Sequence, residues 1–301
     1  MAQKKSTPKK KTKKSTGAKR HYPVVRRAEL GSTSENQAVR LLDSAAELSK
    51  LNRRLYRYAR VYPVSISTRP GTTGVIEVYA LRDDWAVHQG LQHAYKAYLA
   101  ATADERANMS KSQIARWEDF RCHDGIAGAF NPLNAKLQDP TFTGGGSRLT
   151  SGEFTLTEVV DASGTTRQFT WGTPSGSEYG ILQEYDKAGN AQPTPSSLVS
   201  GAAGPYSGLE DGNDADVYTD LEAVGNEPPY DATGVNAGTP WVKVGTIGTG
   251  AADQKLSTGF FNAPCGLVVL VGPSNDWNSD QVTFEVKAGQ YKGVGGMSLL
   301  E

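Results

Sequence analysis

The charges of this chain are divided between its N-terminus and the rest of the sequence, and this division limits what each part can fold into. Residues 1–27 contain eleven Lys or Arg and no Asp or Glu. Few of these residues are apolar, so burial cannot offset the conformational entropy that ordering would cost. The other 274 residues hold 21 basic and all 32 acidic residues, a net charge of −11. We therefore expect residues 1–33 to form a disordered basic arm and residues 34–301 to fold.

The cations of the arm are the first candidate binding residues. Clustered Lys and Arg neutralise phosphates without reading base sequence, so an arm of this composition predicts nucleic-acid binding. The candidates are Lys4, Lys5, Lys9, Lys10, Lys11, Lys13, Lys14, Lys19, Arg20, Arg26 and Arg27. A solvating tail or a nuclear-import signal is the alternative, because residues 9–14 have the composition of such a signal and one set of lysines can serve both roles.

A helical pattern follows the arm. Ser34 opens a possible capping box, and apolar residues then recur at three- and four-residue spacing as far as Leu55, which predicts a helix over residues 34–58. Four cations occupy the opposite side of this helix at i, i+3, i+4 and i+7: Lys50, Arg53, Arg54 and Arg57. We interpret them as a second nucleic-acid-binding surface next to the arm. The alternative is a solvated helix face that neighbouring carboxylates partly neutralise.

The body is predicted to consist mostly of strands, with one helical insertion. Residues 60–81 alternate apolar and polar positions and are rich in β-branched side chains, which predicts two strands joined by a turn. Residues 84–121 return to a helical period, and we expect Trp85 and Trp117 to pack in the core of this insertion. Six further strands are expected at residues 153–160, 166–170, 180–185, 241–247, 266–271 and 281–288.

About eight strands of this kind predict a mainly β fold, a jelly-roll two-sheet sandwich with inserted helices and a disordered basic N-terminal arm. Residues 188–242 interrupt the strands with eight acidic residues and no Lys or Arg. Their periodicity is weak and Gly and Pro are frequent, which predicts long surface loops. Such loops would face away from bound nucleic acid, because a polyanion repels them.

No motif predicts an enzyme or a cofactor. Neither a G-x-S-x-G elbow nor a G-x-x-x-x-G-K loop occurs, and the four histidines form no H-x-H or H-E-x-x-H pair. Residues 211–216 bring several carboxylates together, which is compatible with a Ca²⁺ site, but the EF-hand spacing is missing and we expect a solvated acidic loop without metal. We expect no membrane insertion, because no apolar run of about 18 residues occurs.

Three stretches resemble one known family of proteins. They are residues 51–62 (LNRRLYRYARVY), 78–85 (VYALRDDW) and 114–121 (IARWEDFR). They are similar to sequences in capsid proteins of small circular single-stranded DNA viruses of the environmental, Rep-encoding type. The resemblance implies a viral structural protein that assembles with copies of itself into an icosahedral capsid of jelly-roll subunits and packages single-stranded nucleic acid, DNA in this family. Such a protein would reside in the virion after assembly in the host nucleus or cytoplasm. The family has no catalytic residues, so the resemblance implies none for this chain.

Other classes of protein share parts of this pattern. Small positive-strand RNA viruses use the same body plan, so the residues leave DNA or RNA open, along with the triangulation number, the host and its receptor. A cellular nucleic-acid-binding protein without sequence specificity would explain the arm, although the body has no zinc-finger spacing and no RNP-like motif. A carbohydrate-binding or adhesive β-sandwich would explain the Gly-rich loops and exposed aromatic residues such as Trp171, Trp241 and Trp277, but would leave the arm without a role.

Overall fold

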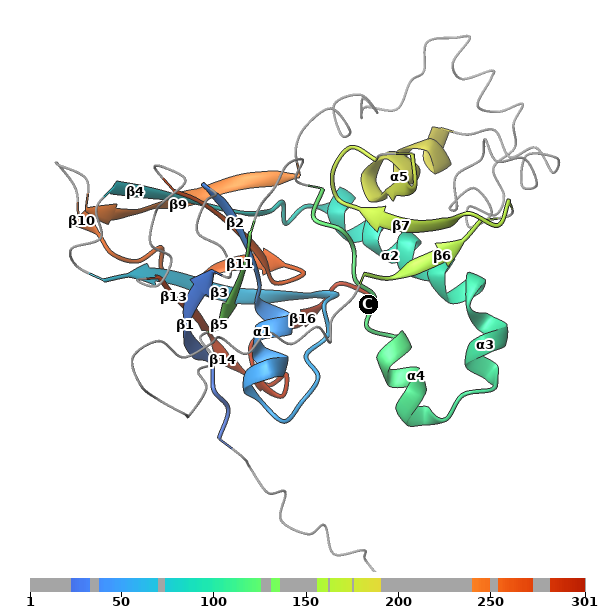
Figure 1. Cartoon of the computed structure of the whole chain (residues 1–301), viewed down its shortest axis with the longest axis horizontal. Coiled ribbons are helices and arrows are strands. Elements are labelled where there is room, and N and C mark those ends of the chain that lie inside the picture. The colour runs from blue at the N-terminus through green and yellow to red at the C-terminus, as the bar shows by residue number, and fades with distance from the viewer. Residues whose placement is uncertain are drawn as a thin grey trace, which may run out of the picture.

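A computed structural model describes most of the body of the chain. The described residues are 23–32, 38–69, 74–125, 131–135, 156–161, 163–174, 176–190, 240–249, 254–272 and 282–300. Within them strand residues outnumber helical ones and most paired strands run antiparallel, so the protein is mainly β (Figure 1). No helix in these segments is both long enough and apolar enough to cross a membrane.

A helix-rich segment interrupts the strands between β4 and β9. The strands are β1 (Arg27–Ser32), β2 (Val39–Asp43), β3 (Arg60–Thr68), β4 (Gly74–Leu81), β5 (Asn131–Ala135), β6 (Glu158–Val160), β7 (Thr166–Thr170), β8 (Glu178–Gly180), β9 (Trp241–Thr249), β10 (Gln254–Lys255), β11 (Phe261–Pro264), β12 (Leu267–Val271), β13 (Val282–Val286), β14 (Ala288–Gly289), β15 (Gly293–Val294) and β16 (Met297–Ser298). The helices are α1 (Ser44–Leu51), α2 (Trp85–Ala101), α3 (Ala103–Ala107), α4 (Lys111–Trp117) and α5 (Ile181–Asn190).

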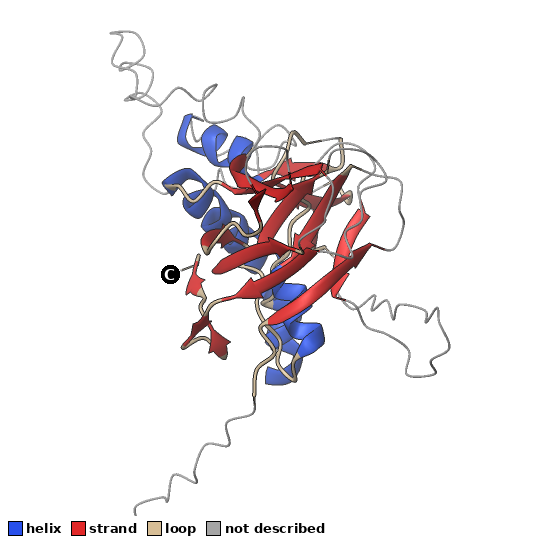
Figure 2. Cartoon of the chain, turned by 90° about the vertical axis from the view of Figure 1, so that its left-hand side faces the viewer, coloured by secondary structure: helices blue, strands red, loops and turns tan. Residues whose placement is uncertain are grey.

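Eight of the strands form two four-stranded antiparallel layers (Figure 2). One layer has the order β1-β13-β3-β11 and the other has the order β2-β12-β4-β9. The second half of β1 also pairs with β5, and β5 pairs with β2, so the two layers are joined along that side. Side chains of both layers pack into one apolar cluster, as in a β-sandwich.

The core between the layers follows from the alternation of side chains along the strands. Val64 and Ile66 of β3 point inward beside Phe284 of β13, and they meet Val268 and Leu270 of β12 from the opposite layer. All five side chains are completely buried. Each contributes roughly 1.5–3 kcal/mol relative to an exposed position, so this cluster favours the observed pairing of the layers.

The segment between β4 and β9 forms a second packed unit. Asp84 caps α2, because its carboxylate accepts a hydrogen bond from the N–H of Val87 at 3.0 Å. α2 packs against α5, beside the small sheet β6-β7-β8 (Figure 1). Trp171 is 1% exposed in this core, and its Nε1 donates to the hydroxyl of Tyr58 at 2.9 Å. The insertion is therefore fastened to the loop that precedes β3.

The prediction of one helix over residues 34–58 is wrong for most of that range. β2 occupies the residues before α1 and pairs with β12 along its whole length. Asp43 caps α1 by accepting a hydrogen bond from the N–H of Ala46 at 2.9 Å, and the helix ends at Leu51. The prediction failed because a short run of apolar residues does not distinguish a strand from a helix, and pairing with β12 stabilises the strand. The predicted capping box at Ser34 lies outside the described residues.

The prediction of a disordered arm over residues 1–33 is wrong at its C-terminal end. β1 pairs with both β13 and β5, and its Leu30 is completely buried. Val24, before β1, is partly buried against the core. The folded domain therefore includes residues from Val24 onward, and the prediction for residues 1–22, which are not described, stays a prediction.

Most of the remaining predictions of strands and helices are confirmed, whereas one strand and the burial of two tryptophans were predicted wrongly. The strands expected at residues 60–81, 166–170, 241–247, 266–271 and 281–288 and the helices at 84–121 are confirmed, and the strand at 153–160 is described only as β6. The strand expected at 180–185 is wrong, because β8 ends at Gly180 and α5 follows. Trp85 and Trp117 are 48% and 38% exposed rather than packed in the core. Of the acidic region at 188–242, residues 191–239 are not described.

Candidate nucleic-acid interface

The predicted binding residues of the arm lie mostly outside the described part of the chain, since none from Lys4 to Arg20 is described. Arg26 is half-buried just before β1, and Arg27, the first residue of β1, is exposed. The carbonyl of Arg26 accepts a hydrogen bond from the N–H of Val286 at 2.9 Å. The last two cations of the predicted arm therefore belong to the folded domain.

Two of the four cations predicted to form a helical row are engaged in ion pairs. Lys50 Nζ lies 2.8 Å from Glu47 Oε1 within α1, and both side chains are largely buried. Arg57 Nη2 lies 2.6 Å from Glu118 Oε2. A paired cation offers a third partner little net charge, so these two residues present less positive charge than the sequence indicates.

The other two cations of the row lie in the loop between α1 and β3 rather than on a helix. Arg53 is exposed and Arg54 is half-buried. Arg54 Nη1 donates to the carbonyl of Lys292 at 3.1 Å, and Lys292 Nζ donates to the carbonyl of Leu55. These bonds place the cations of Arg54 and Lys292 close to each other, and both side chains donate to backbone carbonyls, which carry no formal charge.

The β14–β15 hairpin brings further cations to the same loop. Tyr291 is covered by Arg60, whose Cζ lies 3.8 Å from the ring centroid, and Lys292 Nζ lies 5.2 Å from that centroid. The hydroxyl of Tyr291 also accepts a hydrogen bond from the N–H of Arg57 at 3.1 Å. The sequence prediction missed Lys292, because only the tertiary fold brings the C-terminal hairpin to the loop after α1. It also missed Arg60, which it assigned to a strand and not to the row of cations.

We call the resulting cluster the basic root surface: Arg54, Arg60 and Lys292, together with the exposed Arg53 that precedes Arg54 in the chain. Figure 1 shows α1, β1 and β14 in the lower part of the sandwich. The nearby carboxylates Glu47 and Glu118 are already paired with other cations. The surface therefore combines several positive charges with hydrogen-bond donors, which suits phosphate groups.

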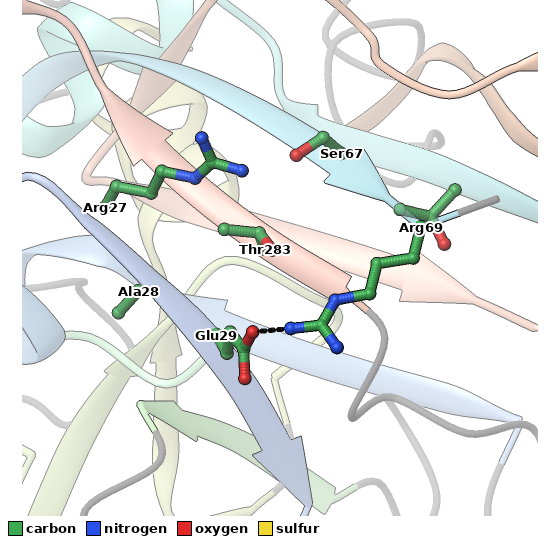
Figure 3. A pocket seen from close by; sticks show the side chains of 7 residues that line it. Arg27, Ala28, Glu29, Ser67, Arg69 and Thr283 are labelled. Atoms are coloured by element: carbon green, nitrogen blue, oxygen red, sulfur yellow. Dashed lines mark hydrogen bonds and ion pairs between the residues drawn. The ribbon is translucent and has the colours of Figure 1, made fainter.

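A pocket of about 350 Å³ beside β1, β13 and β3 is a weaker candidate (Figure 3). Arg27 and Arg69 extend over it, and Arg69 forms an ion pair with Glu29. Arg27 lies directly opposite Glu285 in the register of the sheet. Two guanidinium groups are thus matched by two carboxylates, so this pocket attracts a polyanion less than the basic root surface does.

A buried charged cluster around Arg121 has a structural role. Arg121 Nε lies 2.9 Å from Asp119 Oδ2, and its Nη1 contacts Asp43, the cap of α1. Asp119 also accepts a hydrogen bond from the N–H of Tyr58 at 2.8 Å. Burial lowers the pKa of Arg121, but the two carboxylates raise it by more, so the cation is retained. The cluster joins the insertion to α1 and to the loop before β3.

The two cysteines are buried thiols. Cys122 and Cys265 both lie in the core of the insertion. Burial raises the pKa of each thiol well above its usual value, which keeps the thiols protonated and poorly nucleophilic. Among the described residues, no group of three or more His, Cys, Asp or Glu is arranged to hold a metal ion.

Comparisons of the chain with models of protein families, with curated proteins and with solved structures found no match. Two of the three stretches that resemble capsid proteins contact each other in the structure. Residues 51–62 contact residues 114–121 through the Arg57–Glu118 ion pair and through the bond from Tyr58 to Asp119. They form the junction between the sandwich and its insertion, next to the basic root surface.

Proposed function

We propose that this chain is the coat protein of a small icosahedral virus, a jelly-roll subunit that assembles with copies of itself and packages single-stranded DNA. The strand order carries this proposal. Numbered along the chain, the eight strands of the two layers are β1, β2, β3, β4, β9, β11, β12 and β13. Their layers then read 1-8-3-6 and 2-7-4-5.

This order is the one expected when a single long hairpin winds around itself. Strands 1 and 8, 2 and 7, 3 and 6, and 4 and 5 are neighbours, as in an extended hairpin, and the remaining contacts between 8 and 3 and between 7 and 4 arise on winding. A jelly roll has this arrangement, and it is a common architecture of viral shell subunits. The β-sandwich therefore supports the fold that the resemblance implies.

The charge distribution supports the same proposal. Eleven cations lie in the first 27 residues, and the chain enters the folded domain beside the basic root surface. The rest of the chain is net acidic, so nucleic acid would be attracted to one side of the subunit. A subunit that encloses a polyanion needs such a polarity, with its cations directed inward.

The burial of Trp171 weakens the carbohydrate-binding alternative, which relied on exposed aromatic residues. Trp171 lies in the core and Trp241 is half-buried, while Trp277 lies outside the described residues. A cellular nucleic-acid-binding protein would share the basic arm and surface, and it differs from a coat protein in its state of assembly.

Light scattering and negative-stain electron microscopy of the purified full-length chain, with and without single-stranded DNA, test the proposal. We expect closed particles of uniform size, because one chain encloses a volume through repeated symmetric contacts. Protein that stays monomeric across a range of concentration, salt and pH, with or without DNA, would contradict the proposed function. Monomers that nevertheless bind DNA would point to the cellular nucleic-acid-binding class.

A further inference from the structure

The side chain of Asn52 forms hydrogen bonds with the backbone of Val25, one of the first described residues of the chain. Asn52 Oδ1 accepts a hydrogen bond from the N–H of Val25 at 2.9 Å, and Asn52 Nδ2 donates to the carbonyl of Val25 at 2.8 Å. The same Nδ2 donates to the carbonyl of Leu48 at 2.9 Å, which anchors Asn52 to the end of α1. The amide thus satisfies both backbone groups of Val25, as a neighbouring strand would.

The β14–β15 hairpin holds the same segment from another side. Gly293, at φ 94°, lies so close that a Cβ at this position would be 2.6 Å from Val24 Cγ2. Val24 itself is partly buried against the core. The next residue of the hairpin toward the N-terminus is Lys292, a member of the basic root surface. The arm therefore enters the domain between Asn52 and the hairpin.

We propose that Asn52 and the β14–β15 hairpin form a clamp that fixes where the basic arm joins the folded domain, so that the arm and the basic root surface bind the same stretch of single-stranded nucleic acid. This inference rests on the nucleic-acid binding of the proposed function. The length of the chain limits how far Arg20 can lie from the start of the described domain. Arg20 is three residues before Pro23, so their Cα atoms lie within about 11 Å of each other. Fixing the root of the arm raises the effective concentration of its cations at the surface.

Asn52→Ala tests the clamp without changing any charge. Limited digestion with trypsin, followed by mass spectrometry, should show cleavage after Arg26 several-fold faster than in the unchanged protein, because the bond becomes accessible once the root detaches. Asn108→Ala is the matched control: Asn108 Nδ2 donates to the carbonyl of Asp104 at the end of α3, as Asn52 does at the end of α1, but far from the arm in sequence. Unchanged cleavage in Asn52→Ala would show that the clamp does not hold the arm.

Binding to an oligothymidylate tests the functional half of the inference. Asn52→Ala should bind roughly three- to tenfold more weakly with an unchanged dependence on salt, because the same cations act without being held together. If Asn52→Ala folds poorly, Val24→Ala provides a second test that leaves Asn52 and α1 intact. It should change the cleavage rate and the affinity in the same directions. Faster cleavage with unchanged affinity would overturn the inference while leaving the proposed function standing, whereas failure of the unchanged protein to bind would refute the nucleic-acid binding itself.

Discussion

Pairing and burial decide which charged side chains of this protein are available to a ligand. Lys50, Arg54 and Arg57 look equivalent in the sequence, yet Lys50 and Arg57 each form an ion pair with a carboxylate, whereas Arg54 donates to the backbone carbonyl of Lys292. A count of cations therefore overestimates what the loop after α1 offers to nucleic acid. The Lys50–Glu47 pair can be anticipated from its three-residue spacing, but the Arg57–Glu118 pair cannot, because 61 residues separate its members along the chain.

The unequal availability of these cations leads to a prediction for binding. Changing Arg53 and Arg54 together to Gln should reduce the slope of log K against log salt by about 1.4 for single-stranded DNA, because each lost phosphate contact removes about 0.7. Titration of an oligothymidylate at several salt concentrations measures this slope. Lys96→Gln, an exposed cation on α2, serves as the control and should leave the slope nearly unchanged. An equal change in both variants would mean that the basic root surface has no special part in binding.

The buried thiols give a prediction about reactivity. Burial raises the pKa of Cys122 and Cys265, so at about pH 8 the folded protein holds less thiolate than free cysteine would. Iodoacetamide should therefore alkylate both residues slowly in the folded protein and rapidly after denaturation, as measured by mass spectrometry. Prompt alkylation of either residue under native conditions would show that the insertion opens readily beside Tyr58.

At the level of elements, the strands were predictable where their own residues specify them, and the helices were predictable where caps are strong. β3 and β4 alternate clearly, and α2 begins at a capping aspartate. β2 was missed because its pairing with β12 comes from residues more than 200 positions away. α5 was missed because Ile181 and Leu182 are buried against α2, which a strand-like apolar run does not reveal. The candidate site was predictable only as far as the arm and Arg53 and Arg54, since its hairpin residues arrive through the tertiary fold.

The revised boundary of the arm can be tested by truncation. Removing residues 1–22 should leave thermal unfolding nearly unchanged, whereas removing residues 1–32 should prevent stable folding, because β13 then loses a partner and the core loses Leu30. Loss of a buried Leu side chain alone costs about 2–5 kcal/mol. Circular dichroism during heating measures both variants. A cooperative transition at the original temperature in the longer truncation would show that β1 is dispensable to the fold.

At the scale of the whole molecule, exposed large apolar side chains of the described residues occur both on the sandwich and on the helical insertion. α3 and α4 contain no buried residue, and α4 ends at the exposed Trp117. Short helices are marginally stable in water unless an apolar face is covered. In the proposed shell, a neighbouring copy would supply that cover, because exposed apolar groups mark contact surfaces and closed assemblies repeat the same contacts.

This reasoning predicts that Trp117 becomes protected on assembly. Acrylamide should quench the tryptophan fluorescence of assembled particles less than that of dissociated subunits, and Trp117→Phe should remove much of the difference. Trp85→Phe is the control and should leave the difference largely intact, because Trp85 already packs edge-on against Tyr185 of its own chain, at 6.1 Å between ring centroids. Equal quenching of Trp117 in subunits and particles would mean that α4 stays exposed to solvent in the shell. The contacts between copies would then have to lie on the sandwich, where β9 and the residues around Phe260 leave further apolar surface exposed.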